Sequence, residues 1–517
     1  DAGEQEPLCT YRIANFKTAS ADKDAGAAFL KYKDFKPYVD YLNSMEDENI
    51  AQAIPNARAS QWMEENIPLF ECSQKNFEEM YYYRWWTLRK HIKETPVGYG
   101  MTEFLVNRSY ADKYNLIACA IGHHIYESRW LRNPEYLNQI IHTWYRGNEG
   151  GPMAKMTKFS SWNADAVLGR YMVDGNKEFL LDMVKDLEAE YARWEKTNRL
   201  PNGLYWQGDV QDGMEESISG GRRKQYARPT INSYMYGNAK ALSLIGIMTG
   251  DEGMAMKYGL KADSIKTLVQ DKLWNTDHHF FETMRGDASA EVREAIGYIP
   301  WYFNLPDASS KYTVAWKEVM DEKGFSAPYG LTTAERRHPE FRTHGVGKCE
   351  WDGAIWPFAS AQTLTAMANF MNNYPQTVLT DSVYFHHMER YVESQHHRGR
   401  PYIGEYLDEV TGYWLKGDQE RSRYYNHSTF NDLIITGLIG LRPRLDNTIE
   451  VNPLIPADKW DWFCLDNVLY HGHNLTILWD KNGDRYHCGK GLRIFVNGKE
   501  AGHADTLTRL VCENALK

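Results

Sequence analysis

Two acidic loops that lie far apart in the sequence contain the side chains best suited to proton transfer. The first, residues 202–217, mixes glycines and aromatic residues with four acids: Asp209, Asp212, Glu215 and Glu216. The second, residues 400–414, has Glu405 between a glycine and a tyrosine, and two further acids follow: Asp408 and Glu409. Apolar walls and neighbouring negative charge would keep one carboxyl protonated, while an ionised carboxyl opposite it could accept a proton from water. The loops therefore predict paired acid and base groups, with a solvated acidic loop as the alternative for residues 202–217.

Several other segments combine aromatic rings with amides, acids and arginines. Flat rings suit the C–H faces of a sugar, and bidentate polar groups suit its hydroxyls. The chain has 17 Trp and 34 Tyr, a supply that serves sugar binding and also an ordinary core. The candidate sugar-binding residues stand near predicted helix starts beside long loops: Trp162, Asp165, Arg228, Asn232, Tyr236, Trp351, Trp356 and Tyr406.

Other chemistries lack their motifs in this sequence. It contains no G-x-G-x-x-G, P-loop, H-E-x-x-H or G-x-S-x-G motif. The histidines come in adjacent pairs such as His123 and His124, and neighbours on a helix point about 100° apart, which is poor for chelating one metal. The seven cysteines are scattered without a C-x-x-C motif, so their pairing stays open. We expect neither a metal ion nor a cofactor.

Composition excludes several classes of partner. The net charge of −10 supplies no basic surface for nucleic acid or for an anionic membrane. The longest apolar run, residues 433–441, is about half of the roughly 18 residues that a membrane span needs. The chain starts at Asp1 with a polar stretch and no Met, as after removal of a leader, so we expect a secreted, periplasmic or cell-surface protein. The oligomeric state stays open.

Helical periodicity predicts about twelve helices in the middle of the chain. They are expected at residues 76–93, 110–127, 134–146, 160–173, 177–195, 232–248, 252–273, 288–303, 309–322, 353–372, 376–396 and 428–440. Short turns alternate with long loops between them, as in stacked helical hairpins whose long loops share one side. This pattern predicts a mainly α fold, an (α/α)6 toroid, with both acidic loops at its long-loop end.

The last part of the chain changes character. From Ile449 onwards, short alternating apolar runs are separated by Asn-Gly and other glycine-rich turns, which predicts antiparallel hairpins. We therefore expect three parts: an N-terminal bracing segment (1–75), a catalytic barrel (76–442) and a small C-terminal antiparallel β domain (443–517).

Three segments resemble motifs of glycoside hydrolase family 63 and its mannosylglycerate-hydrolase-like and trehalase relatives. Asp-Gly-Met-Glu-Glu-Ser at residues 212–217 is similar to the acid motif Ser-Gly-Met/Trp-Asp. Glu-Tyr-Leu-Asp-Glu-Val-Thr-Gly at residues 405–412 is a looser form of the base motif Glu-Asn-Tyr-Asn-Pro-x-Thr-Gly. Trp-Asp-Gly-Ala-Ile-Trp at residues 351–356 resembles Trp-x-Gly-Pro-x-Trp. The resemblance implies an (α/α)6 barrel, inversion at the anomeric carbon, Glu215 as acid and Glu405 as base.

The motifs depart from the family pattern in two places. Glu215 stands where the family has Asp, which leaves Asp212 as an alternative proton donor. The base motif lacks its Asn and Pro, so the family's substrate class does not carry over.

We expect an exo-acting, inverting glycoside hydrolase with a carbohydrate substrate. Three alternatives remain: a sugar epimerase or isomerase on a helical toroid, which would use pocket histidines; a polysaccharide lyase, which would use Tyr or His bases and basic residues; and a non-catalytic glycan-binding protein.

Overall fold

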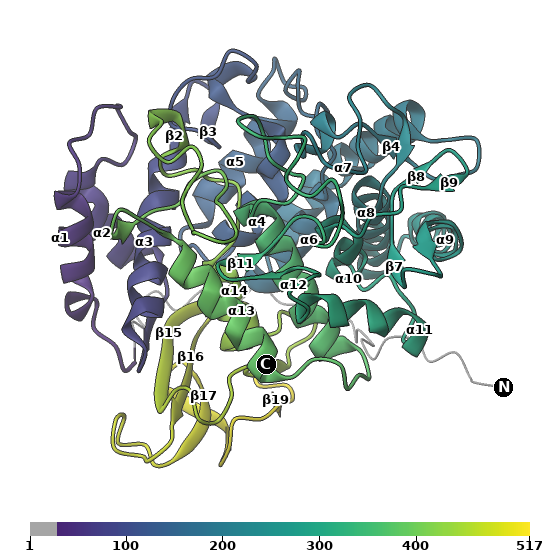
Figure 1. Ribbon diagram of the computed structural model, residues 1–517. Coiled ribbons are helices and arrows are strands. Elements are labelled where there is room, and N and C mark those ends of the chain that lie inside the picture. Colours follow the sequence, from purple (N-terminus) through teal and green to yellow (C-terminus); the bar gives the residue numbers. More distant parts are fainter. Residues whose placement is uncertain (1–27) are drawn as a thin grey trace.

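The computed structural model describes residues 28–517 (Figure 1). The expected bracing segment therefore lies partly outside the described residues. Its described part contains helices α1 (Lys36–Ser44) and α2 (Asn56–Asn66), which contact each other and α3 (Lys75–His91). Among the described residues, no helix is both long and apolar enough to cross a membrane.

Six helices form a closed circle of contacts. They are α4 (Ile121–Ser128), α6 (Asn163–Asp174), α8 (Pro229–Thr249), α10 (Ile299–Tyr302), α12 (Pro357–Asn373) and α14 (Asn431–Leu433), which continues as the π-helical turn Ile434–Leu438. Each contacts the next in this order, and α14 contacts α4. The chain is thus mainly α, as the periodicity predicts.

Between these helices the chain forms a second set. It consists of α3, α5 (Pro134–Arg146), α7 (Lys177–Asn198), α9 (Glu252–Leu268), α11 (Ser310–Thr313) with the 3-10 turn Val314–Val319, and α13 (Asp381–Ser394). Contacts join α6 to α7, α8 to α9 and α12 to α13, while α13 also contacts α3. The chain therefore alternates between the circle and its neighbours, in the order that the predicted hairpins require.

The short turns follow the circle helices. Glycine at the end of one helix and a capping Asn or Asp at the start of the next explain the turns after α6 and α8. Helix α6 ends at Gly175, whose φ of 66° is the left-handed region that favours glycine. The side chain of Asn176 then caps α7 by accepting a hydrogen bond from Phe179 N at 3.0 Å. Gly250 and Asp251 repeat this arrangement between α8 and α9.

The long segments precede the circle helices and carry small strands. These strands are β2 (Ile92–Thr95), β3 (Gly98–Met101), β4 (Trp206–Gln207), β5 (Tyr226–Ala227), β6 (Trp274–Asn275), β7 (Phe280–Phe281), β8 (Met284–Arg285), β9 (Ala288–Ser289), β10 (Ser326–Ala327), β11 (Gly330–Leu331), β12 (His396–His397) and β13 (Arg400–Pro401). Every long segment leads into the first turn of a circle helix, so its side chains gather at those N-terminal ends.

Several predicted helices are shorter than expected, including those at 309–322, 376–396 and 428–440. The prediction at 110–127 becomes 3-10 turns followed by α4, because Tyr114 and Asn115 adopt positive φ values of 62° and 63°. The prediction at 288–303 covers strand β9, a 3-10 turn and the short α10. Helix α12 begins at Pro357 rather than near 353, since proline fits the first helical turn but not the interior.

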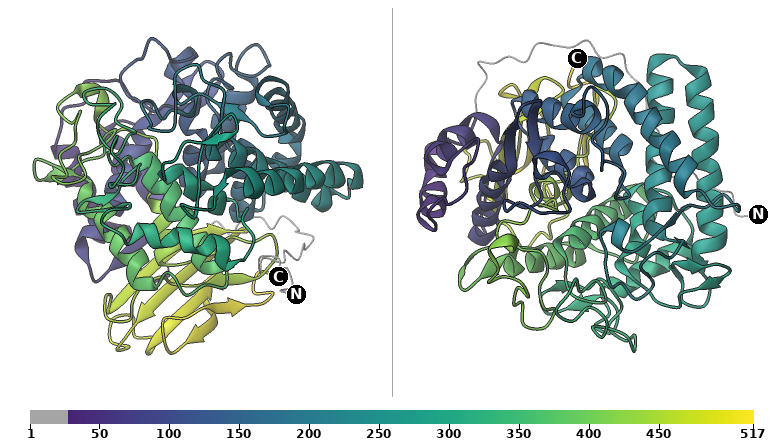
Figure 2. Two further views of the ribbon diagram at one scale, coloured as in Figure 1. Left: turned by 45° about the vertical axis from the view of Figure 1, so that its right-hand side comes forward. Right: turned by 90° about the horizontal axis from the view of Figure 1, so that it is seen from above.

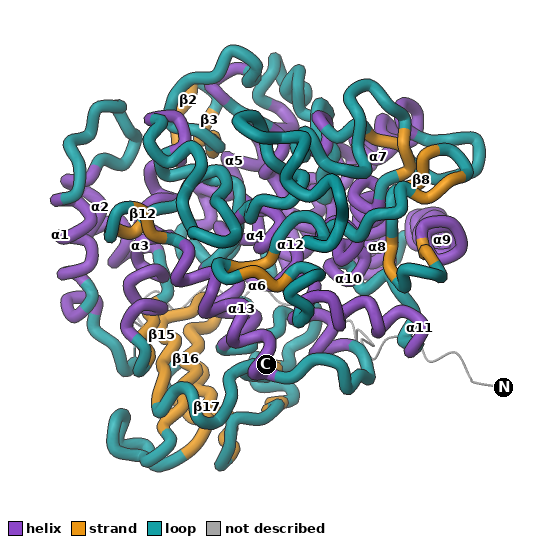
Figure 3. The backbone as a smooth tube through the Cα atoms, viewed as in Figure 1, coloured by secondary structure: helices purple, strands orange, loops and turns teal. Residues whose placement is uncertain are grey.

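The C-terminal strands form an antiparallel sheet with one addition that the sequence did not predict. Its order is β1-β15-β16-β17-β18, with β1 (Leu69–Cys72), β15 (Trp462–Tyr470), β16 (His473–Asp480), β17 (Gly491–Val496) and β18 (Lys499–Ala504). Strand β1 comes from the N-terminal part and pairs Leu69 with Asp466. Strands β14 (Ile449–Val451) and β19 (Leu510–Cys512) form a second pair. These strands lie below the helical part in the left view of Figure 2 and in Figure 3.

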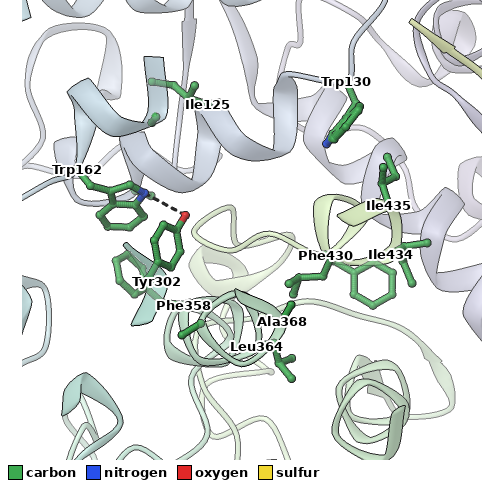
Figure 4. Packing of buried hydrophobic residues seen from close by; sticks show 14 of the residues in the cluster. Ile125, Trp130, Trp162, Tyr302, Phe358, Leu364, Ala368, Phe430, Ile434 and Ile435 are labelled. Carbon is green, nitrogen blue, oxygen red and sulfur yellow. Dashed lines mark hydrogen bonds between the residues drawn. The ribbon is translucent and has the colours of Figure 1, made fainter. Parts of the chain in front are cut away.

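Buried aromatic and aliphatic side chains from several of these helices pack together (Figure 4). Trp162 is fully buried, and its Nε1 donates to the Tyr302 hydroxyl at 3.2 Å. Its ring lies 4.9 Å from that of Tyr234 and 6.1 Å from that of Phe358, measured between centroids. Gly122 of α4 makes room for this indole, because a Cβ there would lie 2.1 Å from it. Trp162, predicted to bind sugar, is thus placed in the core.

Candidate active site

The loop that carries Glu215 is fixed by a buried ion pair. The Asp212 carboxylate accepts hydrogen bonds from Arg228 Nε at 2.6 Å, from Thr230 Oγ1 at 2.5 Å and from the Ser160 hydroxyl. Neither the Asp212 nor the Arg228 side chain is exposed to solvent. Three donors already hold Asp212, so its geometry suits an anchor for the loop better than a proton donor.

Arg228 and Asn232 tie the same loop to the start of α8. Arg228 Nη1 also donates to the Ser219 hydroxyl at 3.2 Å. Asn232 holds the backbone of Tyr205, accepting from its N and donating to its O, both at 2.8 Å. Both side chains are fully buried. Arg228 and Asn232, which the sequence predicted to bind sugar, therefore form hydrogen bonds within the protein.

Glu405 lies on a short extended segment that is held on both sides. Ile403 N donates to the Tyr83 hydroxyl at 3.0 Å, and Tyr425 N donates to Ile403 O at 3.1 Å. On the other side, Leu407 and Ile355 exchange two backbone hydrogen bonds. Glu405 is 6% exposed, and its Oε2 has no hydrogen-bond partner among the described residues.

The two glutamates act on each other electrostatically. Burial, together with the negative charges of Glu405 and Asp209, raises the pKa of Glu215 to about 7. The thiol of Cys349 is close to both, since burial and the charges of Glu215 and Glu405 raise its pKa to about 12. The structure thus brings together the two carboxyls that the sequence assigned to acid and base.

Cations face Glu405. Lys416 Nζ lies 3.8 Å from Glu405 Oε2, and this lysine is nearly buried. Burial raises the pKa of Glu405, whereas the positive charges of Lys416, Arg421 and Arg108 act against that rise. Glu405 is therefore the carboxyl of the pair whose ionised form is supported by its neighbours.

Three aromatic rings form a stack next to Glu405. The rings of Trp351 and Trp356 are 4.5 Å apart at 20°, and those of Trp356 and Tyr406 are 4.5 Å apart at 19°. Trp356 Nε1 donates to Glu350 O at 3.1 Å, and the Tyr406 hydroxyl donates to Lys348 O. Because the rings of Trp351 and Tyr406 cover both faces of the Trp356 indole, the edge of this indole is the part that can contact a ligand.

Asp165 and Tyr236 lie elsewhere. They line a cavity of about 860 Å³ whose described lining includes neither Glu215 nor Glu405. That cavity reaches the C-terminal ends of α10 and α12 and residues 442–446. Asp165 accepts a hydrogen bond from the Tyr126 hydroxyl at 2.6 Å, and burial raises its pKa to about 7. The structure therefore does not bring these two predicted residues to the glutamate pair.

One group of side chains has the composition of a metal site. The ligand atoms of His278, Glu282 and Glu291 lie within 4.8 Å of one another. Glu282 is already satisfied, since it accepts from His278 Nδ1 at 2.6 Å, from Asn275 at 2.9 Å and from Ser289 at 2.5 Å. These contacts describe an ion pair that stabilises a hairpin. The six cysteines in the described part of the chain are free thiols.

Sequence reasoning missed four residues of the site: Glu103, Arg108, Lys416 and Tyr425. Glu103 and Arg108 belong to a long loop, which was the one available signal, but no motif marks either residue. Lys416 follows the base motif and has no counterpart in it.

Comparison with known proteins identifies the family to which the chain is similar. A family model, the mannosylglycerate hydrolase MGH1-like glycoside hydrolase domain, matches residues 113–428. A second model, the C-terminal domain of glycosyl hydrolase family 65, matches residues 441–503. A solved structure named Sialidase is 86% identical, with a TM-score of 0.95, over 96% of this chain. This chain spans 46% of that protein, less than half of its length.

Two more distant structures share the fold. The GH63 mannosylglycerate hydrolase from Thermus thermophilus, solved with Tris and D-glycerate, is 11% identical with a TM-score of 0.52, covering 69% of this chain and 98% of that one. The GH78 family rhamnosidase of Bacillus sp. GL1 is 12% identical with a TM-score of 0.56, covering 83% and 41%. The family resemblance read from residues 212–217, 351–356 and 405–412 is confirmed by the first family model. The chain therefore belongs to the mannosylglycerate hydrolase MGH1-like family of glycoside hydrolases.

Proposed function

We propose that this protein is an exo-acting glycoside hydrolase that inverts the anomeric carbon, with Glu215 as general acid and Glu405 as general base. One observation carries the proposal: two buried carboxyls from distant loops interact, and negative charges act on Glu215 whereas positive charges act on Glu405. Pairs of titratable groups with such opposed environments mark acid and base assignments.

We further propose that the helices form an (α/α)6 toroid. The closed order of contacts from α4 through α14 supports it, as does the alternation of short turns and long segments. In this arrangement the segments before α8 and α14 open on one side of the ring. That placement explains how Glu215 and Glu405 reach the same sugar.

The reaction follows from the two protonation states. Glu215 gives its proton to the glycosidic oxygen as the bond from that oxygen to the anomeric carbon breaks. Glu405 takes a proton from a water molecule whose oxygen attacks the same carbon from the opposite face. Each turnover leaves Glu215 ionised and Glu405 protonated, and exchange with solvent resets both. Inversion requires about 6.5–9.5 Å between the carboxyls, enough for that water.

The test combines a substrate screen with matched variants. Wild-type protein is incubated with aryl glycosides and plant and host oligosaccharides, including sialosides because the 86% identical chain is named a sialidase. Glu215→Gln and Glu405→Gln should each lower kcat on the order of 10²-fold or more. Glu216→Gln is the control, since Glu216 lies in the same loop but pairs with Arg222 at 3.3 Å.

The product distinguishes the proposed reaction from its alternatives. Proton NMR of the first product formed should show the anomer opposite to that of the substrate. Retention would contradict inversion, an unsaturated sugar would indicate a lyase, and an isomerised sugar without cleavage would indicate an epimerase. Near-normal turnover by either Gln variant would remove that glutamate from the mechanism.

A further inference from the structure

A third carboxyl, that of Glu103, lies close to the proposed acid and base. Glu103 follows strand β3 and is 5% exposed. Its Oε1 accepts a hydrogen bond from the Tyr425 hydroxyl at 2.5 Å. Its backbone O accepts from Asn426 N at 3.0 Å, and Tyr425 N donates to Ile403 O, two residues before Glu405. A continuous set of hydrogen bonds therefore fixes Glu103 relative to Glu405.

The second oxygen of Glu103 is left without a protein partner. Oε2 is buried and has no hydrogen-bond partner among the described residues. Leaving a buried polar atom unpaired is costly, so such atoms call for an explanation in function or a ligand. Glu405 Oε2 also lacks a hydrogen-bond partner among the described residues, although Lys416 Nζ lies 3.8 Å from it. Two unsatisfied carboxyl oxygens in one buried site match the hydroxyls of a sugar.

We propose that Glu103 is a substrate-binding residue, and that its Oε2 binds a hydroxyl of the sugar held between Glu215 and Glu405. This inference rests on the proposed function, because it places the sugar at the same carboxyls. Tyr425 acts as the positioning residue by holding the other oxygen.

The charge state of Glu103 determines the direction of this hydrogen bond. Burial and the negative charges of Glu405 and Glu215 raise the pKa of Glu103 to about 8. At neutral pH the carboxyl is therefore largely protonated, and Oε2 donates to the sugar hydroxyl. A glutamine at this position would keep both functions, with its oxygen accepting from Tyr425 and its amide donating to the sugar.

The experiment compares Glu103→Gln with Glu103→Met in the full chain. The readouts are KM and kcat for a glycoside that the wild-type protein hydrolyses, and the Kd of the released monosaccharide by calorimetry. Glu103→Met should raise KM and Kd on the order of 10-fold or more with a smaller effect on kcat, since one buried hydrogen bond to the sugar is lost. Glu103→Gln should restore both close to wild type.

Glu190→Gln is the matched control. The Tyr145 hydroxyl donates to Glu190 Oε2 at 2.5 Å, and Asn163 Nδ2 donates to Oε1 at 2.9 Å, so both of its oxygens have protein partners. Its pKa is likewise raised to about 7 by burial. This variant should leave KM and Kd unchanged, and melting curves of all three variants report any effect on folding.

The outcomes separate this inference from the proposed function. If wild type hydrolyses a glycoside and Glu103→Met keeps its KM and Kd, the inference is wrong and the proposed function stands. If wild type binds a monosaccharide from the screen through Glu103 but hydrolyses nothing, the inference stands without the hydrolase. If Glu103→Met is unfolded, Glu103→Asp takes its place, because it keeps a carboxyl but withdraws it by one methylene. KM and Kd raised on the order of 10-fold, with Glu190→Gln at wild-type values, support the inference, and unchanged values overturn it. No binding and no turnover by folded wild type contradict both proposals.

Discussion

At the scale of single residues, the two proposed catalytic glutamates differ in the charges that surround them. Glu215 faces the negative charges of Glu405 and Asp209, which favour its protonated form. Burial raises the pKa of Glu405, but Lys416, Arg421 and Arg108 act against that rise and favour its ionised form. A carboxyl that stays protonated can serve as acid, and one that stays ionised can serve as base. Both residues are glutamates, so the assignment of one as acid and the other as base depends on their surroundings and not on the residue type.

This division predicts a bell-shaped dependence of kcat/KM on pH. The reaction needs a protonated Glu215, so the rate should fall above about pH 7 as that carboxyl loses its proton. It also needs an ionised Glu405, so the rate should fall in acid as Glu405 gains a proton. Initial rates measured from pH 4 to pH 10 on one glycoside check this. A rate that keeps rising above pH 8 would exclude Glu215 as the acid.

Lys416 offers a sharper test of the base. Its ammonium 3.8 Å from Glu405 lowers the pKa of that carboxyl, so Lys416→Met should raise it. The acidic limb of the pH profile should then move to higher pH by about 1 unit, and Lys416→Arg should restore it. Lys348→Met is the control, because Lys348 lies 3.8 Å from Glu216 but is largely exposed. An unmoved acidic limb would mean that the charge of Lys416 does not influence the base.

At the scale of elements, the acid depends on a loop that Asp212 and Arg228 hold in place. Asp212→Asn would leave the buried guanidinium of Arg228 without its counter-ion, which destabilises a fold by about 3–5 kcal/mol. Urea denaturation should detect this loss, and kcat should fall because Glu215 is only three residues away. Glu216→Gln weakens only ion pairs with the exposed Arg222 and Lys348, so it should cost less than about 1 kcal/mol. Unchanged stability of Asp212→Asn would show that the loop is held by other contacts.

The helical elements were predictable where local signals agree. The turn at Gly175 and Asn176 carries both a left-handed glycine and a side-chain cap, and the helices on either side begin and end near the predicted residues. Residues 288–303 carry an apolar period but form strand β9, a 3-10 turn and the short α10, and Gly297 of that turn packs against Phe280, where a Cβ would lie 2.3 Å from the ring. That contact is tertiary, so periodicity cannot reveal it.

The site was also predictable only in part, because some of its residues are brought together only by tertiary contacts. Glu215 and Glu405 stand out because each is an acid in a loop rich in glycine and aromatic residues. Glu103 and Lys416 become site residues only through the hydrogen bonds and charges that folding brings to them. Asp165 carries the right chemistry at a helix start, yet its side chain turns to another cavity.

At the scale of the whole molecule, a strand from the N-terminal part of the described chain joins the C-terminal sheet. Strand β1 pairs with β15, and the Asp466 carboxylate accepts from the backbone N atoms of Phe29 at 2.6 Å and Leu30 at 2.9 Å. Strand β15 also contacts α6 of the helical circle. The N-terminal segment, the helices and the C-terminal sheet therefore share contacts, and we expect them to unfold together.

Phe70 of β1 is the residue with which to test this coupling. It is fully buried, and its ring lies 5.1 Å from Tyr81 of α3 and 6.1 Å from Trp460, which precedes β15. Phe70→Ala removes packing at this three-way contact and should cost about 3–5 kcal/mol. Calorimetry should give a single transition at a lower Tm, coincident with loss of helical circular dichroism. Two separate transitions would mean that the sheet and the helices are independent units, and that β1 joins the sheet without linking its stability to the site.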